Sequence, residues 1–471
     1  MADHDYIYDN ITEDVDEALS VEGELPVGLR GTFYVIGGTG TQVGAQQLHG
    51  FDAHGRVTAV QLGEGTARLR ARMVATPLYE RERASGRIEK RRLFHNKPGR
   101  WSNLFDVDLG NNAWHNIVPW GDSVVATNDP GFFLLDPETL QTRGPAPVHP
   151  AQGATFTPMV RVDPATGRRI LWELRPGLKD TLVVRELDQD FTVAAEHSWK
   201  LPRGAAFFHD IAFTERYYLV VQFSSLALLP ALWGARPIAE ALRFEPAQTP
   251  RVILLPRDGG PLVDVPLRSG RMHFHHWNAF DDGDQVVLDS IGYDGAVRFS
   301  VLYPPAARQA LGVAFEPTPP GASVRYRIDP TAGTARAEVL DAVPAEAPEI
   351  RPDRRGRAYR YGYAPTLGGP GDEQDPQAIV SFHALARHDF QDGTVATWDA
   401  GPHAFVSPVA FVPRDGPDED DGWLVAWVQD AAAGRAWVGI FDARDVARGP
   451  VARLHAGRMI GAISHVSFAP A

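Results

Sequence analysis

One kind of turn recurs along the whole chain and constrains the fold more than any other feature. An aspartate stands at the end of an apolar run and is usually followed within a few residues by proline, glycine or both, as hairpin turns require. The segments are 51–56 (FDAHGR), 135–140 (LDPETL), 162–167 (VDPATG), 328–333 (IDPTAG), 388–393 (HDFQDG) and 441–446 (FDARDV). Hairpins repeated over the full length predict a β-propeller, in which each blade is a small antiparallel sheet.

The runs between these turns are short and rich in β-branched and aromatic residues, which predicts strands rather than helices. They include 32–36, 122–127, 217–222, 285–289, 423–428 and 437–441. No linker or change of composition divides the 471 residues. We therefore expect an all-β chain with an acidic N-terminal extension at 1–21 and a single propeller domain at 22–471.

Charge and cysteine content exclude several classes of function. Against 46 basic residues stand 59 acidic ones, and the net charge of -13 repels the phosphates of nucleic acids. The chain has no cysteine, so disulfides, thiolate metal sites and thiol nucleophiles are all excluded. Histidines and carboxylates remain as the available metal ligands.

Targeting and membrane signals are weak. The acidic N-terminus lacks the basic and apolar pattern of a secretory signal, so we expect a cytoplasmic protein. A membrane-spanning helix needs about 20 apolar residues, and the longest apolar candidate, Leu226–Gly234, is much shorter. That segment suits a buried helix or loop best, with peripheral contact to a membrane surface as the alternative.

Three histidines stand at strand ends in apolar surroundings: His209, His275 and His465. Taken singly, a histidine in such a place is more often a hydrogen-bonded core residue than a ligand. Together, however, they converge only if strands of different blades point to a common axis, and a propeller provides that geometry. Imidazoles meeting on an axis suit a divalent first-row metal such as iron.

The segments that carry these histidines resemble the histidine motifs of the carotenoid cleavage oxygenase family. Four further stretches resemble that family in the same order along the chain: 24–38 (ELPVGLRGTFYVIGG), 49–57 (HGFDAHGRV), 346–361 (EAPEIRPDRRGRAYRY) and 411–425 (FVPRDGPDEDDGWLV). The resemblance implies a seven-bladed propeller with loops and short helices capping one face. It also implies an axial Fe(II) held by four histidines, which uses dioxygen to split an alkene into two carbonyl products.

Residue by residue, the resemblance implies that His209, His275 and His465 bind the metal and that Glu346 accepts the far ring N–H of a ligand. His276 points to the opposite face of its strand and is left out. In 157–164 (TPMVRVDP), the family's remaining ligand position holds Met159, whose thioether is a poor donor for Fe(II). Two further positions at which the family has glutamates hold Asn128 and Pro408.

These departures leave three arrangements open. In the first, three histidines hold the iron and leave an extra position for substrate or oxygen. In the second, another histidine such as His273 or His149 fills the place of Met159. In the third, the metal is lost. The leading hypothesis is an Fe(II)-dependent, non-haem dioxygenase that cleaves an apolar carotenoid, apocarotenoid or stilbene-like alkene with O2. The alternative is a ligand-binding propeller or an enzyme of another reaction class. Aromatic residues beside the ligands are candidates for an apolar substrate tunnel, with core packing as the competing interpretation: Phe207, Phe208, Phe274, Trp277 and Phe280.

Overall fold

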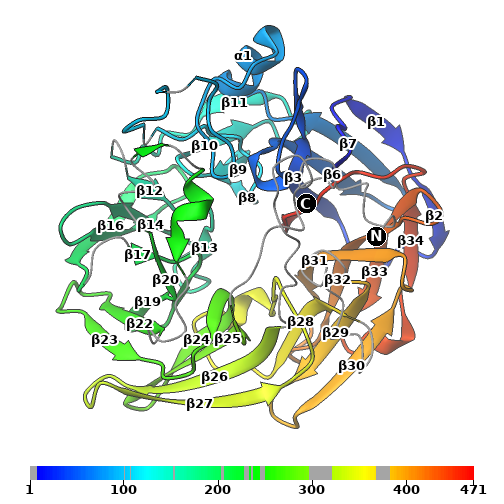
Figure 1. Cartoon of the computed structure of the whole chain (residues 1–471). Coiled ribbons are helices and arrows are strands. Elements are labelled where there is room, and N and C mark those ends of the chain that lie inside the picture. Colours follow the sequence, from blue (N-terminus) through cyan, green and yellow to red (C-terminus); the bar gives the residue numbers. More distant parts are fainter. Residues whose placement is uncertain are drawn as a thin grey trace.

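The computed structural model describes residues 8–99, 101–106, 108–151, 154–202, 206–226, 233–234, 237–243, 250–295, 321–367 and 382–471. Seven antiparallel sheets follow one another around a ring, as Figure 1 shows, and the chain is a seven-bladed β-propeller. The fold predicted from the recurrent turns is therefore confirmed.

Each blade runs from an outer to an inner strand, and neighbouring strands are hydrogen-bonded. From the outside inward, the first holds β1 (Val15–Ala18), β7 (Ala67–Met73), β6 (His54–Leu62), β3 (Gly31–Gly40) and β35 (His465–Pro470). The second holds β11 (Thr142–Pro145), β10 (Gly131–Leu135), β9 (Ser123–Asn128) and β8 (Asn116–Trp120). The third holds β16 (Val193–Lys200), β15 (Thr181–Leu187) and β14 (Arg169–Arg175), and β14 pairs with both β12 (Thr155–Phe156) and β13 (Arg161–Val162).

The remaining blades follow the same order. The fourth holds β23 (Val263–Pro266), β22 (Arg251–Pro256), β19 (Tyr217–Gln222) and β18 (Ile211–Phe213). The fifth holds β27 (Thr334–Asp341), β26 (Gly321–Asp329), β25 (Gln285–Tyr293) and β24 (Met272–Asp282). The sixth holds β30 (Thr394–Asp399), β29 (Ala384–Asp389) and β28 (Tyr361–Thr366). The seventh holds β2 (Ser20–Gly23), β34 (Ala452–His455), β33 (Arg435–Asp442), β32 (Gly422–Asp430) and β31 (Ala404–Pro413).

Small elements lie outside the blades. Two short sheets are formed by β17 (Ala206–Phe207), β20 (Ser224–Leu226) and β21 (Leu242–Arg243), and by β4 (Gln42–Val43) and β5 (Gln46–Gln47). The helix α1 spans Pro77–Ser85, and 3₁₀ turns span Gly50–Asp52, Ile238–Ala241, Pro352–Arg354 and Val446–Arg448.

The recurrent aspartates do what the turn pattern predicts. The Oδ1 atom of Asp136 accepts hydrogen bonds from the backbone N–H groups of Glu138 and Thr139, at 3.1 and 2.8 Å. Asp163 accepts from the N–H of Ala165 at 2.9 Å in the same way. These side chains satisfy backbone donors at the strand ends, which fixes where each hairpin turns.

Both ends of the chain close the ring. β1 and β35 lie in the first sheet, and β2 pairs with β34 in the seventh. Strand residues begin at Val15, and the segment 1–21, the expected N-terminal extension, includes paired residues of β1 and β2.

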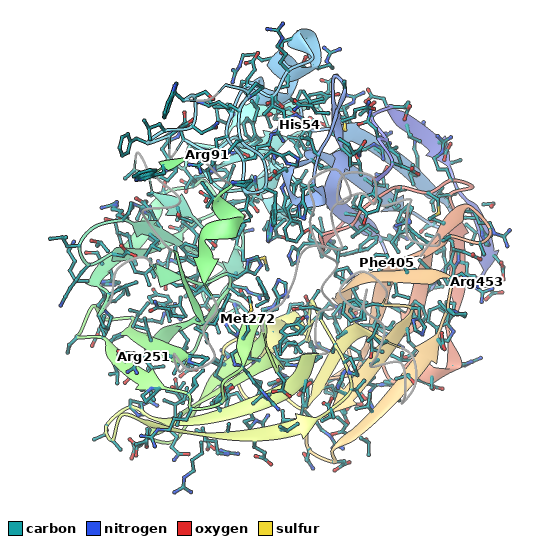
Figure 2. The ribbon with its side chains drawn as sticks, in the orientation of Figure 1. His54, Arg91, Arg251, Met272, Phe405 and Arg453 are labelled. Carbon is teal, nitrogen blue, oxygen red and sulfur yellow. The ribbon has the colours of Figure 1, made fainter. Side chains whose placement is uncertain are left out.

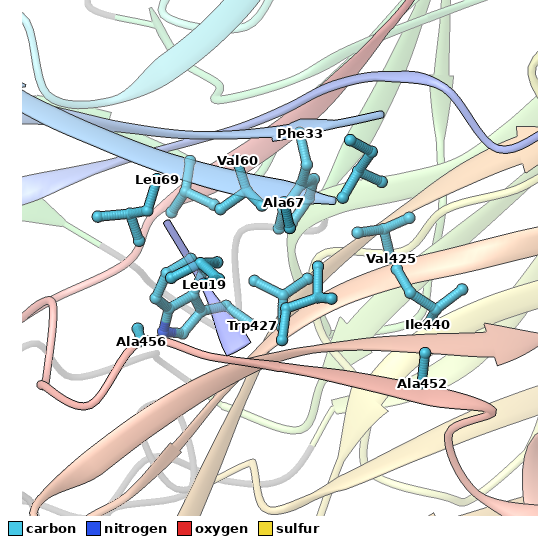
Figure 3. Packing of buried hydrophobic residues seen from close by; sticks show 14 of the residues in the cluster. Leu19, Phe33, Val60, Ala67, Leu69, Val425, Trp427, Ile440, Ala452 and Ala456 are labelled. Atoms are coloured by element: carbon cyan, nitrogen blue, oxygen red, sulfur yellow. The ribbon is translucent and has the colours of Figure 1, made fainter. Parts of the chain in front are cut away.

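The closure is reinforced by a shared hydrophobic core, shown in Figure 3. Phe33, Val60 and Leu69 of the first sheet pack against Trp427 and Ile440 of the seventh, and all five are fully buried. Burying large apolar side chains on both sides of the junction is the main favourable contribution to holding the ring closed.

Within the described residues, no helix is long and apolar enough to cross a membrane. Most of the apolar run 226–234, the candidate for peripheral membrane contact, lies outside the described residues.

Candidate metal centre

Four histidines from four different blades meet at the inner edges of the sheets. One ring nitrogen from each of His115, His209 and His465 lies within 4.8 Å of the other two. His275 completes the group, with its ring centroid 4.9 Å from that of His209 and 5.1 Å from that of His465. The three histidines selected from the sequence are therefore brought together, and the structure adds His115 to them.

The four side chains stand at or near the beginning of the inner strand of their blades. His115 immediately precedes β8, His209 lies two residues before β18, His275 lies within β24, and His465 begins β35. These are the inner strands, and β8 borders the middle of the ring in Figure 1. Met272, also in β24, lies toward the middle of the ring in Figure 2, whereas Arg453 of β34 lies at its outer rim.

A close approach of the first blade positions His115. The N–H of Gly55 donates to the carbonyl of Asn112 at 2.8 Å, and a Cβ on Gly55 would lie only 1.9 Å from the carbonyl oxygen of Ala113. Ala113 has a φ of 48°, a strained conformation for a residue with a Cβ. The N–H of His115 itself donates to the carbonyl of Thr127 in β9 at 3.2 Å. The backbone before β8 is thus fixed on two sides.

A second glycine allows the His465 segment to approach. A Cβ on Gly37 would lie 1.8 Å from the carbonyl oxygen of Ala462, so only glycine fits at this place in β3. His465 then pairs with Ile36, and the N–H of Ser464 donates to the carbonyl of Ile36 at 2.8 Å. The contact between β3 and β35 therefore sets the position of this imidazole.

Asp210 ties the strands of His209 and His275 together. Its buried carboxylate accepts a hydrogen bond from the N–H of His276 at 3.1 Å. It also forms a two-pronged ion pair with Arg161, in which Nε of Arg161 lies 3.0 Å from Oδ1 of Asp210. Because Asp210 follows His209 and His276 follows His275, this carboxylate holds two site histidines in fixed relation.

The far nitrogen of one histidine is held by a glutamate. Nδ1 of His275 lies 2.6 Å from Oε2 of Glu346, whose other oxygen, Oε1, accepts a hydrogen bond from the hydroxyl of Tyr293 at 2.6 Å. Glu346 also accepts from the N–H of Ala347. In the part of the chain that the structure describes, it is the carboxylate hydrogen-bonded to one of the four imidazoles.

Electrostatics keep most of this cluster neutral. Burial, followed by the neighbouring imidazoles, lowers the pKa of His115 and His465 well below the usual range and lowers the pKa of His209 to about 3. Burial acts in the same direction on His275, but Glu346 outweighs it and the pKa of His275 is raised. Neutral imidazoles with free lone pairs are the form in which histidine binds metals.

Two ring atoms of the cluster lack a protein partner. Nε2 of His115 and Nε2 of His275 are buried and have no hydrogen-bond partner in the described structure. Most buried polar atoms in proteins are hydrogen-bonded, so unpartnered ones call for an explanation such as an ion. Four imidazoles converging from four blades, two of them with unpartnered nitrogens, fit a divalent first-row metal.

The two histidines considered as replacements for the ligand at Met159 do not take that place. Nδ1 of His273 lies 3.0 Å from Oγ of Ser290, and its Nε2 lies 2.9 Å from the hydroxyl of Tyr326, so both ring nitrogens are engaged. His149 is exposed. The fourth imidazole comes instead from His115, in the segment AWHN. Sequence reasoning missed it, although it stands next to a strand in apolar surroundings.

His276 was left out of the predicted ligand set because of its expected orientation. Its Nδ1 lies 2.9 Å from Oγ of Ser290, within hydrogen-bond distance. The two positions that lack a family glutamate hold residues without a side-chain carboxylate: Asn128 ends β9, and Pro408 lies in a bulge of β31.

The aromatic residues proposed for a tunnel have different surroundings. Phe274 packs edge-on against His209, with ring centroids 5.3 Å apart, and also contacts Phe223 and Tyr293. The side chain of Phe207 lies outside the described residues. The others belong to buried hydrophobic clusters: Phe208, Trp277 and Phe280. A run of aromatic residues does not distinguish these two roles, because both bury the ring.

Comparison with known proteins gives a consistent result. Residues 8–470 match the family described as retinal pigment epithelial membrane protein. The chain is 32% identical over 464 residues to apocarotenoid-15,15'-oxygenase of Synechocystis, covering 95% of this chain and 92% of that protein. It is 27% identical to isoeugenol monooxygenase of Pseudomonas putida, covering 92% of this chain and 90% of the relative. The chain is 25% identical to resveratrol cleavage oxygenase 1 of Chaetomium globosum, covering 93% of this chain and 82% of the relative.

Solved structures agree with these matches. The crystal structure of cobalt-substituted apocarotenoid oxygenase of Synechocystis superposes with a TM-score of 0.90 at 30% identity, covering 100% of this chain and 98% of that one. Its cobalt is a property of that protein, but it shows that the fold has been solved with a metal. With the family model spanning residues 8–470 and the same fold throughout, the chain belongs to the retinal pigment epithelial membrane protein family, the carotenoid cleavage oxygenases.

Proposed function

We propose that His115, His209, His275 and His465 hold one Fe(II) ion and that the protein is a dioxygenase that cleaves a carbon-carbon double bond of an apolar alkene. The observation that carries this proposal is the convergence of four imidazoles from four blades, with two buried Nε2 atoms that have no hydrogen-bond partner among the described residues. In this assignment Met159 leaves no gap in the ligand set, because His115 provides the fourth imidazole.

The protein residues define what the site can do. Imidazole ligands carry no negative charge, so the four histidines leave the double positive charge of a bound Fe(II) uncompensated. When bound, the ion supplies the binding and activation of dioxygen. The Glu346 carboxylate orients His275, and the carboxylate of Asp210, which follows His209, accepts the backbone N–H of His276, which follows His275. Ligands held in this way keep an open position in a constant place.

The substrate class follows from two considerations. The relatives are named for an apocarotenoid, isoeugenol and resveratrol, all of which carry a double bond conjugated to a largely apolar framework. In this chain, Phe274 lies beside His209 and continues into Phe223 and Tyr293. An aromatic surface next to the metal holds an apolar alkene and excludes water from it. We therefore propose a carotenoid, apocarotenoid or stilbene-like substrate, with one O2 consumed and two carbonyl products formed per alkene.

A substrate screen tests this function. The Fe(II)-loaded protein is incubated in air with an apocarotenal, isoeugenol and resveratrol, and carbonyl products and oxygen uptake are measured. The expected result is paired carbonyl products from at least one alkene, equimolar oxygen uptake, and no product under anaerobic conditions or with His465→Ala. Tight binding of these alkenes by iron-loaded protein without product would contradict the dioxygenase and favour the ligand-binding propeller.

A further inference from the structure

The inner strand of the fifth blade is irregular where it passes the histidine cluster. In the pairing of β24 with β25, His273 lies opposite Gly292 and His276 lies opposite Ser290. The two residues between these histidines, one of which is His275, therefore face a single residue of β25, and this is a β-bulge. A bulge turns side chains away from the directions that regular alternation would give them.

The bulge separates two histidines that a regular strand would place on one face. Residues two apart in a strand share a face, so His273 and His275 would point the same way. Instead, Nδ1 of His273 lies 3.0 Å from Oγ of Ser290. The ring of His275, in contrast, meets those of His209 and His465 in the cluster. The irregular backbone thus lets one imidazole reach the cluster and keeps the other away from it.

One buried hydroxyl contacts the bulge at three places. Ser290 is fully buried, and its Oγ donates to the carbonyl oxygen of His275 at 3.1 Å. The same oxygen lies 3.0 Å from Nδ1 of His273 and 2.9 Å from Nδ1 of His276. A hydroxyl donates one hydrogen bond and accepts two, so it can make all three contacts at once. Nδ1 of His273 also lies 3.0 Å from the carbonyl oxygen of Ile291, which only accepts, so this nitrogen carries a proton.

The two histidines on either side of the bulge are anchored again at other atoms. Nε2 of His273 lies 2.9 Å from the hydroxyl of Tyr326 in β26. The backbone N–H of His276 donates to the carboxylate of Asp210 at 3.1 Å. The Ser290 hydroxyl is therefore held by side chains whose own positions are fixed by neighbouring strands.

Resting on the proposed metal centre, we propose that Ser290 is a positioning residue, which sets the place of the His275 imidazole from its backbone side. Glu346 acts on the same imidazole from the other end, through Nδ1. Without the Ser290 hydroxyl, the carbonyl of His275 and Nδ1 of His276 lose a buried partner. Unpaired buried polar groups are costly, so the bulge rearranges to find new partners and His275 moves with it.

The test compares Ser290→Ala with the matched control Ser407→Ala. Ser407 is a fully buried serine in the bulge of β31, and its hydroxyl bonds the carbonyl of Pro408 and the N–H of Trp427. Both variants lose buried hydrogen bonds, so thermal unfolding of the metal-free proteins should show lower stability for both.

The metal distinguishes a positioning role from a merely structural one. Each protein is titrated with Co(II) in competition with a chelator, and the absorption bands of bound Co(II), which report the arrangement of its ligands, are recorded. We expect Ser290→Ala to lose about 10-fold in affinity and to shift the bands. Ser407→Ala should keep the affinity and the bands of the wild type.

Wild-type affinity and bands in Ser290→Ala, or equal changes in both variants, would overturn the positioning role and leave the metal centre intact. A wild type that binds no Co(II) would remove the centre and the proposal with it, so the two failures are distinguishable. If Ser290→Ala does not fold, Tyr326→Phe, which removes only the hydroxyl at the far nitrogen of His273, is read by the same bands. The proposal expects those bands to shift, and unchanged bands would contradict it.

Discussion

His275 and Glu346 are joined by a hydrogen bond of 2.6 Å between Nδ1 and Oε2. His275 lies in β24 of the fifth blade, and Glu346 lies in the segment between β27 and β28. Both side chains are largely buried. Such a contact fixes the tautomer of the imidazole, because a proton held on Nδ1 leaves Nε2 free to bind a metal. Within the part of the chain that the structure describes, Nε2 of His275 is buried and has no hydrogen-bond partner.

Replacing this carboxylate should weaken the metal centre. Glu346→Gln keeps the size of the side chain but removes the charge that holds the N–H of His275, so we expect a loss of about 10- to 100-fold in metal affinity. Glu349→Gln is the matched control, because Glu349 pairs with Arg355 rather than with a histidine. Equal affinities for the two variants in a chelator competition would count against the role of Glu346.

Tyr293 should act on the metal only through Glu346. Its hydroxyl donates to Oε1 of Glu346 at 2.6 Å, so Tyr293→Phe frees one oxygen and loosens the orientation of the carboxylate. We expect a loss of about threefold in metal affinity, smaller than the effect of removing the carboxylate itself. In a double-mutant cycle, the same substitution in the Glu346→Gln background should have almost no effect, whereas fully additive losses would show that Tyr293 acts independently.

The close contact at Gly37 should couple blade closure to the site. Gly37→Ala places a Cβ 1.8 Å from the carbonyl oxygen of Ala462, three residues before His465. Overpacking of this kind costs about 1–3 kcal/mol of the free energy of unfolding, and the displaced strand should lower metal affinity as well. The control is Gly131→Ala, where an added Cβ would meet only Nδ2 of Asn111 at 3.5 Å. Unchanged stability and metal binding in Gly37→Ala would contradict this coupling.

The buried pair of Asp210 and Arg161 should make stability depend on pH. Burial raises the pKa of Asp210, but Arg161 outweighs it and the pKa falls well below its usual range. A depressed folded-state pKa contributes stability above the unfolded value of about 3.9, and that contribution is lost as the pH falls toward the folded value. We expect Asp210→Asn to be less stable than wild type at pH 7, by about 3–5 kcal/mol, because Arg161 loses its partner. The test is chemical unfolding of the metal-free proteins at several pH values. The difference in free energy of unfolding between the two proteins should shrink below about pH 3, and a difference that stays constant with pH would contradict the pairing.

The sequence predicts the fold well because its signal is repeated. Asp136 and Asp163 mark strand ends by capping backbone N–H groups, a local interaction that depends on few neighbours. His209, His275 and His465 were selected because of their motifs, and the structure brings them together. His115 could not be found in the same way, since its relation to the others depends on contacts across blades, including the approach of Gly55 to Ala113. The packing of Phe208, Trp277 and Phe280 likewise depends on neighbours distant in sequence.

Every role proposed for the site depends on four histidines, His115 among them, binding one metal ion. The most direct test is the iron content per chain, measured by elemental analysis after anaerobic purification in Fe(II)-supplemented buffer. The wild type is compared with His115→Ala and with His149→Ala, whose histidine is exposed and outside the cluster. We expect close to one iron per chain in the wild type and His149→Ala, and a large loss in His115→Ala. Iron retained in full by His115→Ala, or absent from the wild type, would contradict the four-histidine centre.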